Sequence, residues 1–317
     1  MKTSIGSYKP WYQNGISRRE MIRIFSSSFA ACIAPATLTS QTRVTIDKAN
    51  PKPVLLAVPL FFGDNKRLGT AISNIIQADL ERSGIFSTLK QKKFVQQMNN
   101  IDVTPRFQDW RSIGVEAVII GRTLKIENGN FQVHFRLWDI VLGQLLIEQK
   151  FSVLPKHWRR LGHLVSDQIY QKLTFEQGYF DTRIVFIDET GPKQKRLKRL
   201  AIMDQDGHNL QILSDGSELV ITPRFNPMRQ EITYMSYVKD QPRVFMMDLT
   251  SGQKQVVGDF PGMTFAPRFS PDGKRVIMSV QHNTSSWIVE IDLKSRRSRH
   301  LTRSDAIDTS PCFHTSI

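Results

Sequence analysis

Hydrophobic and polar residues in the first half of the chain follow the two periods that distinguish strands from helices. A continuous apolar run at 53–63, which begins at a proline and ends at a glycine, predicts a buried strand. At 65–84 the apolar residues recur at helical steps, which predicts an amphipathic helix that ends at Gly84. Further short strands and helices are expected at 86–89, 91–98, 115–127, 131–140, 144–153 and 156–173. Strands interleaved with helices, followed by a meander and a last helix, predict a small α/β domain.

From about residue 181 the pattern changes to short strands that repeat. A Pro-X-Phe tripeptide recurs every 44 residues, at 223–225, 267–269 and 311–313. Aspartates recur with the same spacing, at Asp204, Asp248 and Asp292. Two independent markers with one period, and several short strands in each unit, are typical of β-propeller blades. The second half is therefore expected to be an incomplete, all-β propeller of about three four-stranded blades.

The strands of each repeat can be placed from the same pattern. The units are expected to open with strands at 183–187, 231–235 and 275–279. Second strands end at the periodic aspartates, at 199–204, 243–248 and 287–292. Third strands follow at 210–213, 254–257 and 298–302. The Pro-X-Phe segments then lead into a fourth strand, which is expected to close each unit.

The periodic residues are expected to have structural rather than catalytic roles. The aspartates Asp204, Asp248 and Asp292 stand where turns begin, and a carboxylate in that position can accept backbone N–H bonds. A ring of metal ligands, the alternative, would need more oxygen donors nearby. The periodic phenylalanines are expected to be structural residues that pack between blades, at Phe225, Phe269 and Phe313.

Two periodic arginines have a less obvious role. Arg224 and Arg268 repeat a positive charge beside a tight turn. Each could bind an acidic partner or form an ion pair within its own blade, and the sequence leaves both interpretations open.

The first forty residues have the pattern of an export signal. A basic stretch at 17–23 precedes an apolar run at 24–41 that ends in small residues and is too short to span a membrane. We expect cleavage near residues 36–40, so that 1–40 is removed and the mature chain reaches the periplasm without a spanning segment. Arg18-Arg19 also resembles a twin-arginine signal, and the residues before Cys32 loosely resemble a lipoprotein signal. The export route and the acylation of Cys32 therefore stay open.

Charge and cysteine content bear on partners more than on fold. The 317 residues suggest about two domains, and the net charge of +14 can attract anionic partners or simply keep the surface soluble. The basic run at 193–199 lacks the interleaved aromatics of nucleic-acid-binding segments, which predicts a solvated loop and no nucleic-acid partner. Cleavage after Cys32 would leave Cys312 as the one thiol, so no internal disulfide is expected.

No pattern typical of an enzyme is present in the sequence. No glycine-rich phosphate loop follows the strand at 53–63, and the motifs GxSxG and HExxH are absent. His134 and His163 stand alone and are interpreted as surface or packed histidines. We therefore predict no catalytic, metal-binding or cofactor-binding residues, no cofactor and no small-molecule substrate.

The order of these parts resembles the TolB family, the periplasmic propeller proteins of the bacterial Tol-Pal system. The residues that carry the resemblance are TRVTIDKANPKPVLLAVPLF at 42–61, FDTRIVFI at 180–187 and PRFSPDGKRV at 267–276. The blade signature also occurs in other propellers, so the domain order carries the identification. It implies an export signal at 1–40, a TolB-like α/β domain at 41–175 and a partial propeller at 181–317.

What the resemblance implies is a scaffold that links two membrane proteins and supports outer-membrane invagination in cell division and envelope integrity. Family members bind the inner-membrane protein TolA through the mature N-terminus, which here corresponds to Thr42, Arg43, Val44, Thr45, Ile46 and Asp47. They bind the peptidoglycan-associated lipoprotein Pal through the propeller, where Arg224 and Arg268 are the candidate contacts.

The sequence departs from the family in its number of repeats. The family propeller has six blades, whereas about three can be counted here, so we expect a C-terminally shortened chain. The alternatives are a truncated propeller fragment without function, and the propeller domain of a periplasmic peptidase. The peptidase alternative would need a catalytic domain beyond residue 317, since no Ser/Asp/His constellation is visible outside the blades.

Overall fold

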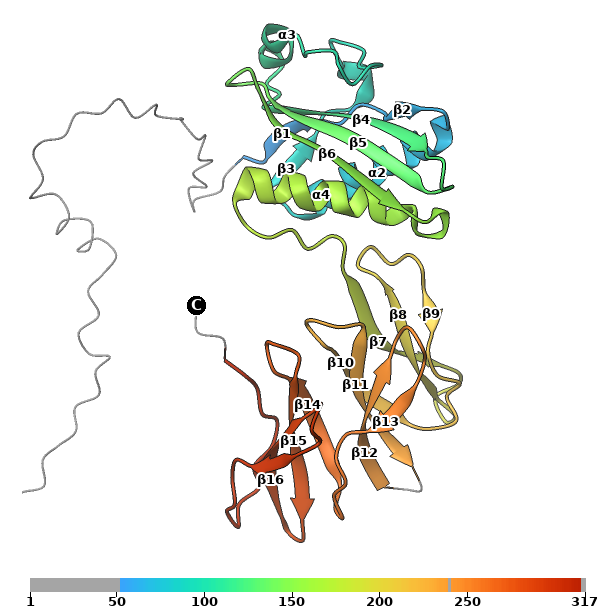
Figure 1. The fold of residues 1–317 in the computed structure, drawn as a ribbon, viewed down its shortest axis with the longest axis vertical. Helices are drawn as coiled ribbons and strands as arrows, with labels where there is room; N and C mark the ends of the chain where they lie inside the picture. The colour runs from blue at the N-terminus through green and yellow to red at the C-terminus, as the bar shows by residue number, and fades with distance from the viewer. Residues whose placement is uncertain (1–51, 239–240, 315–317) are drawn as a thin grey trace, which may run out of the picture. The chain divides into compact units, whose positions relative to one another are not determined.

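The computed structural model describes residues 52–238 and 241–314 (Figure 1). The predicted export signal at 1–40 and the predicted TolA-binding segment lie outside these residues. An α/β sheet comes first and antiparallel sheets follow, which confirms the predicted fold class. Within the described residues, no helix combines the length and the apolar character needed to cross a membrane.

The sheet of the α/β domain mixes parallel and antiparallel pairing. Its strands lie in the order β3-β1-β4-β5-β6, and β2 also pairs with β4. Strand β1 is parallel to β3 and β4, whereas β4, β5 and β6 form the antiparallel meander predicted at 115–153. The strands are β1 (Val54–Ala57), β2 (Phe62–Gly63), β3 (Phe86–Thr88), β4 (Ala117–Lys125), β5 (Phe131–Asp139) and β6 (Gln144–Val153).

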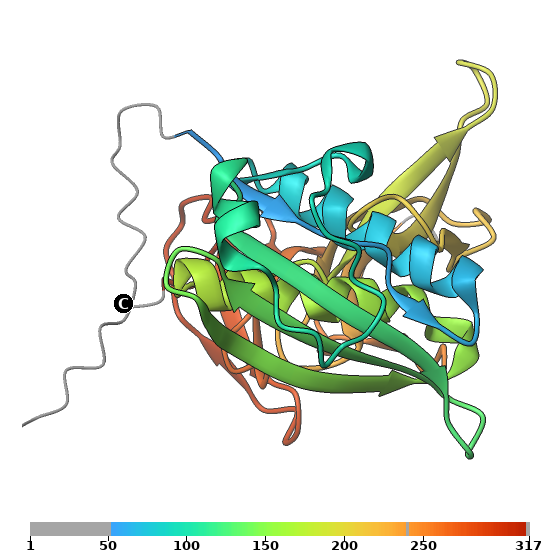
Figure 2. The ribbon, with the colours of Figure 1, turned by 90° about the horizontal axis from the view of Figure 1, so that it is seen from above.

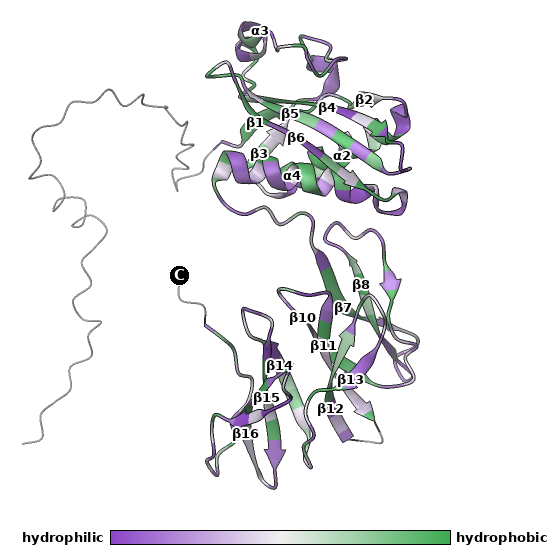
Figure 3. Cartoon of the chain, viewed as in Figure 1, coloured by the Kyte–Doolittle hydropathy of each residue, from purple (hydrophilic) through white to green (hydrophobic). Residues whose placement is uncertain are grey.

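Two helices pack together against this sheet. Helices α2 (Lys66–Arg82) and α4 (Arg159–Thr174) contribute the apolar stripes seen in the sequence, and these residues share one core with β1, β4 and β5 (Figure 3). The side chain of Asn65 accepts a hydrogen bond from Leu68 N at the start of α2. Gly84 has a φ of 72°, the left-handed conformation expected where this helix ends.

The α/β domain has a second apolar core, distinct from the first. One prediction for the residues that pack there is wrong. The residues at 91–98 were expected to form a helix, but only the 3₁₀ turn η2 (Gln91–Lys93) forms. The chain turns extended at Phe94, because Phe94 packs edge-on against the fully buried Trp110. Trp110 lies on the short helix α3 (Phe107–Ser112), which the sequence pattern did not predict. A further 3₁₀ turn, η3 (Pro155–His157), precedes α4.

Three antiparallel sheets form the propeller part of the described chain (Figures 1 and 2). The first contains β7 (Arg183–Thr190), β8 (Leu197–Asp204) and β9 (Gln211–Ile212). The second contains β10 (Val220–Phe225), β11 (Glu231–Val238), β12 (Gln241–Asp248) and β13 (Lys254–Val256). The third contains β14 (Thr264–Phe269), β15 (Arg275–His282), β16 (Ser285–Asp292) and β17 (Ser298–His300).

The Pro-X-Phe segments open blades instead of closing them, contrary to the prediction. Strand β10 pairs with the following strand β11, with Phe225 opposite Ile232, and β14 pairs with β15 in the same way. A tight turn explains this pairing, because Asn226 N donates to Glu231 O and thereby closes a hairpin. The first sheet consequently has three strands rather than the predicted four, and the described residues pair β7 on one side only.

The blades pack on one another through apolar side chains. Phe225 packs into a cluster with Leu200 of the first sheet and Ile232 of the second. Phe269 packs into the corresponding cluster between the second and third sheets, with Val244 and Val276. Each such aromatic removes apolar surface from water, at about 25 cal/mol per Å². The repeated cluster therefore holds neighbouring blades face to face.

The prediction of a solvated loop at 193–199 is correct only for 193–196, which lie in the loop between β7 and β8, since 197–199 begin strand β8; the loop extends beyond its sheet in Figure 2. Lys193 and Lys195 are exposed. Arg196 and Lys198 lie within 4.0 Å of the carboxylate of Glu189. Exposed pairs of this kind contribute little to stability.

Candidate functional site

The two arginines that were predicted to contact a partner lie on the first strands of neighbouring blades. Arg224 is in β10 and Arg268 is in β14, and these two strands contact each other. Both strands have the same irregularity two residues before the arginine, where Thr222 and Ala266 have positive φ values of 51° and 53°. A bulge of this kind re-aims the side chains that follow it. The repeat therefore places two guanidinium groups in equivalent positions on adjacent strands.

Neither guanidinium has a carboxylate within 4.0 Å among the residues that the structure describes. Arg268 donates to the carbonyl of Pro267 at 2.8 Å, and Arg224 makes a longer bond to Pro223 at 3.4 Å. Burial lowers the pKa of Arg268, and the positive charge of Arg224 lowers it further. An ion pair within the blade, one of the two interpretations left open, thus finds no partner in the described part of the chain.

At the third repeat the side chain is different, but the backbone has the same conformation. Ser310 has a φ of 56°, matching Thr222 and Ala266. The residue equivalent to the arginines is Cys312, an exposed thiol. The guanidinium of Arg275 lies over the ring of Phe313, with 6.0 Å between the guanidinium carbon and the ring centroid.

The periodic aspartates lie in turns between strands. Asp248 Oδ1 accepts hydrogen bonds from the backbone of Thr250 at 2.9 Å and Ser251 at 2.7 Å. Asp292 repeats the arrangement with the backbone of Lys294 and Ser295. The bonds from Ser251 and Ser295 are the main reason that the pKa values of these two carboxyl groups are lowered. This geometry stabilises the turn, and neither Asp248 nor Asp292 belongs to the group of possible metal ligands found among the described residues.

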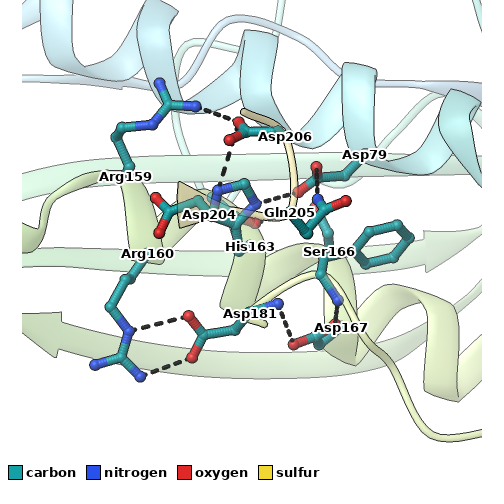
Figure 4. A network of polar contacts seen from close by, with 12 residues as sticks. Asp79, Arg159, Arg160, His163, Ser166, Asp167, Asp181, Asp204, Gln205 and Asp206 are labelled. Atoms are coloured by element: carbon teal, nitrogen blue, oxygen red, sulfur yellow. Dashed lines mark hydrogen bonds and ion pairs between the residues drawn. The ribbon is translucent and has the colours of Figure 1, made fainter. Parts of the chain in front are cut away.

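Asp204 belongs to a different environment, because its turn contacts the α/β domain. The turn at 204–210 joins β8 to β9 and approaches helices α2 and α4 (Figure 4). We call Asp79, Arg159, His163, Gln205 and Asp206 the polar cluster. Its residues are brought together from three segments that are far apart in the sequence.

Asp79 and His163 form the buried centre of the polar cluster. The side chains are 1% and 2% exposed, and His163 Nδ1 lies 2.7 Å from Asp79 Oδ2. Asp79 Oδ1 accepts hydrogen bonds from Arg82 Nη1 at 2.9 Å and from Gln205 Nε2 at 3.0 Å. A buried carboxylate with three donors is a satisfied one, and one of these donors comes from the first blade.

The opposite side of the imidazole faces Asp206. His163 Nε2 is buried, has no hydrogen-bond partner within 52–238 and 241–314, and lies 3.7 Å from Asp206 Oδ2. The guanidinium of Arg159 forms an ion pair with the same Asp206 oxygen. Burial lowers the pKa of His163, but the hydrogen bond and charge of Asp79 and the charge of Asp206 outweigh burial, so the pKa is raised.

Two residues of the polar cluster, His163 and Asp206, lie beside Asp204, and the three present possible metal-ligand atoms within 4.8 Å of one another. A divalent ion there would share the Asp206 carboxylate with the guanidinium of Arg159. The positive charge of Arg159 would also repel the ion. The arrangement therefore suits a proton on His163 better than a metal ion.

A second set of contacts fixes the segment that enters the first blade. Asp167 accepts hydrogen bonds from the backbone N–H groups of Phe180 and Asp181. Arg160 binds Asp181 through both carboxylate oxygens, at 3.0 and 2.7 Å. These contacts, also drawn in Figure 4, position the chain immediately before β7.

In the sequence, His163 stands alone and is expected to be a surface or packed histidine. A signal was present in Asp79, which interrupts the apolar stripe of α2 between Ile76 and Leu80. A carboxylate on the buried face of a helix requires a partner. Nothing in the sequence shows that the partner is 84 residues away.

The structure defines a protein in which a small α/β domain precedes the blades of a β-propeller. The TolB amino-terminal domain model matches residues 42–146, and the TolB β-propeller domain model matches residues 170–316. TolB from Acinetobacter baumannii is 30% identical, with a TM-score of 0.68 over 82% of this chain. The chain belongs to the TolB family. It spans 62% of the length of the Acinetobacter protein.

Other solved structures are less similar. A candidate TolB from Agrobacterium tumefaciens is 10% identical over 57% of this chain and 61% of its own, with a TM-score of 0.32. An acylaminoacyl peptidase from Pyrococcus horikoshii is 20% identical over 27% of this chain and 14% of its own, with a TM-score of 0.23. At these TM-scores neither match supports an inference about this chain.

Proposed function

We propose that the chain is a periplasmic scaffold of the Tol-Pal system that binds TolA through residues 42–47 and Pal through the first strands of its blades. Family membership supports the assignment to this system. The observation that carries the proposal is the pair of guanidinium groups, Arg224 and Arg268, on strands that contact each other, neither of them paired with a carboxylate among the described residues. We assign the chain no catalytic role.

The arginine pair suits an acidic protein surface. Burial lowers the pKa of Arg268, and repulsion from the neighbouring guanidinium of Arg224 lowers it further. A carboxylate from a partner would relieve this repulsion and accept charge-assisted hydrogen bonds from the planar guanidinium. The partner gains specificity because the two groups have a fixed spacing on adjacent strands. Pal would therefore present acidic side chains at this position.

The predicted export signal agrees with a periplasmic location for both interactions. A basic stretch followed by a short apolar run would direct the chain across the inner membrane and then be removed. The segment 42–47 would then lie close to the new N-terminus. A terminal segment can order on a partner without disturbing the packed domain that follows it.

Deletion of residues 42–47 is expected to abolish binding to TolA and to leave binding to Pal unchanged. The reason is that the two proposed surfaces share no residue. Isothermal titration of the mature chain and of the deletion variant against soluble TolA and Pal domains from the same bacterium measures both affinities. A matched control replaces the six residues by a Gly/Ser sequence of equal length. The proposed function would be contradicted if the deletion left binding to both partners unchanged, or if the folded mature chain bound neither TolA nor Pal.

A further inference from the structure

We propose that protonation of His163 fixes the turn between β8 and β9 to helices α2 and α4, and that this contact loosens when His163 loses its proton. The first blade would then be attached to the α/β domain in a pH-dependent way. The inference concerns the polar cluster alone and does not depend on either proposed partner.

The geometry requires a donor on each side of the imidazole. His163 Nδ1 lies 2.7 Å from Asp79 Oδ2, and His163 Nε2 points toward Asp206 Oδ2 at 3.7 Å. Only the imidazolium carries a proton on both nitrogens. A neutral ring that donates to Asp79 would direct the lone pair of Nε2 at the Asp206 carboxylate, inside a site where the ring is 2% exposed. The positive form is therefore the one that suits both neighbours.

The charges around the imidazole favour the same form. They are Asp79 and Arg82 from α2, Arg159 from α4, and Asp204, Asp206 and His208 from the turn. Three carboxylates thus face two guanidiniums, and the imidazolium restores the balance. His208 is exposed and touches only the outer oxygen of Asp206, at 3.3 Å, so solvent screens its charge.

The direction of the pH effect follows from the raised pKa of His163. A group whose folded pKa lies above its unfolded value stabilises the folded contact fully below the unfolded pKa, which is about 6.5 for histidine. The stabilisation disappears as the pH rises through the folded pKa. The contact between the turn and the helices should therefore be tight in mildly acidic solution and weaker in alkaline solution.

The turn has few other attachments to the helices. Arg159 pairs with Asp206, and Gln205 donates to Asp79, so both contacts involve the carboxylates that His163 bridges. Within the turn, His208 N donates to Asp206 Oδ1 and Gly207 N donates to Asp204 O. When His163 becomes neutral, Asp206 is repelled and these amides are expected to open more often. Their hydrogen exchange is therefore a direct readout.

The test combines a histidine titration with hydrogen exchange on the whole chain. NMR of ¹³C-labelled histidine, with the signal assigned from His163→Gln, is expected to show a His163 pKa above 6.5. Protection factors in a peptide spanning 203–210 should fall at least about threefold between pH 6 and pH 8.5. The equivalent turn at 292–297, which contains no histidine, serves as the internal control. His208→Gln should keep the fall, and His163→Gln should remove it.

A second variant keeps the test decisive if His163→Gln does not fold. Asp206→Asn removes one charge with little change of shape and should lower the pKa of His163. A His163 pKa at or below 6.5 in the native chain would overturn the proposal. So would a pKa that does not change in Asp206→Asn, or a fall in protection that persists in a folded His163→Gln variant.

Discussion

Replacement of Asp79 by alanine is expected to destabilise the protein by about 3–5 kcal/mol, the usual effect of removing one partner from a buried ionic contact. Asp79 is 1% exposed and accepts bonds from Arg82, His163 and Gln205. Without the carboxylate, His163 loses the one hydrogen bond that its ring makes in the described part of the chain, and its imidazolium has no close partner on that side. Cavity formation adds to the loss, because the side chain lies inside the helix pair.

Urea unfolding measured by tryptophan fluorescence reports this change, since Trp110, Trp138 and Trp158 all lie in the α/β domain. Asp109→Ala is the matched control. Asp109 forms an ion pair of similar length with Arg106, but it is 44% exposed, and its removal should cost less than about 1 kcal/mol. Equal unfolding midpoints for the Asp79 variant and the native protein would show that the polar cluster does not stabilise the fold.

Local periodicity predicted most of the fold because it reports which face of an element is buried. The helix stripe at 65–84 and the meander at 115–153 both follow from contacts with one apolar core. The repeat at 44 residues predicted the blades for the same reason. The alternation does not predict which strands pair, since a strand such as β10 can pair with the strand before it or with the strand after it while keeping the same alternation. The short turn at 226–230 decided the pairing, and its closing hydrogen bond is not visible as a pattern.

The two candidate sites also differ in how much of each could be predicted from the sequence. Arg224 and Arg268 could be selected from sequence because the repeat itself marks them. Their lack of a carboxylate partner in the described chain is a tertiary property and needed the structure. His163 is the opposite case, because a single histidine on an amphipathic helix has no pattern. Its role depends on Asp79 and Asp206, which folding brings to it from both directions along the chain.

Reversal of both charges, in an Arg224→Glu and Arg268→Glu variant, is expected to weaken binding to Pal by at least about thirtyfold. If the guanidiniums meet carboxylates of the partner, the variant places like charges opposite each other, which costs several kcal/mol. Neither side chain pairs with a carboxylate within the described residues, so the change breaks no ion pair there. Arg224 is exposed, whereas Arg268 is half-buried, so any loss of stability is expected from the change at Arg268. Arg224→Glu alone should therefore lower affinity without lowering stability.

Isothermal titration with soluble Pal at two salt concentrations, together with urea unfolding of each variant, separates these effects. Arg297→Glu is the matched control, because Arg297 is exposed in the turn between β16 and β17 and away from the first strands. Because the test variant reverses two charges, the control combines Arg297→Glu with Lys294→Glu, which gives the same change in net charge. Since long-range attraction depends on net charge and contact depends on position, the control should lower the association rate slightly at low salt and leave affinity at high salt unchanged. Equal losses in both variants would mean that Pal responds to the overall charge of the chain, and the arginine pair would not be its binding site.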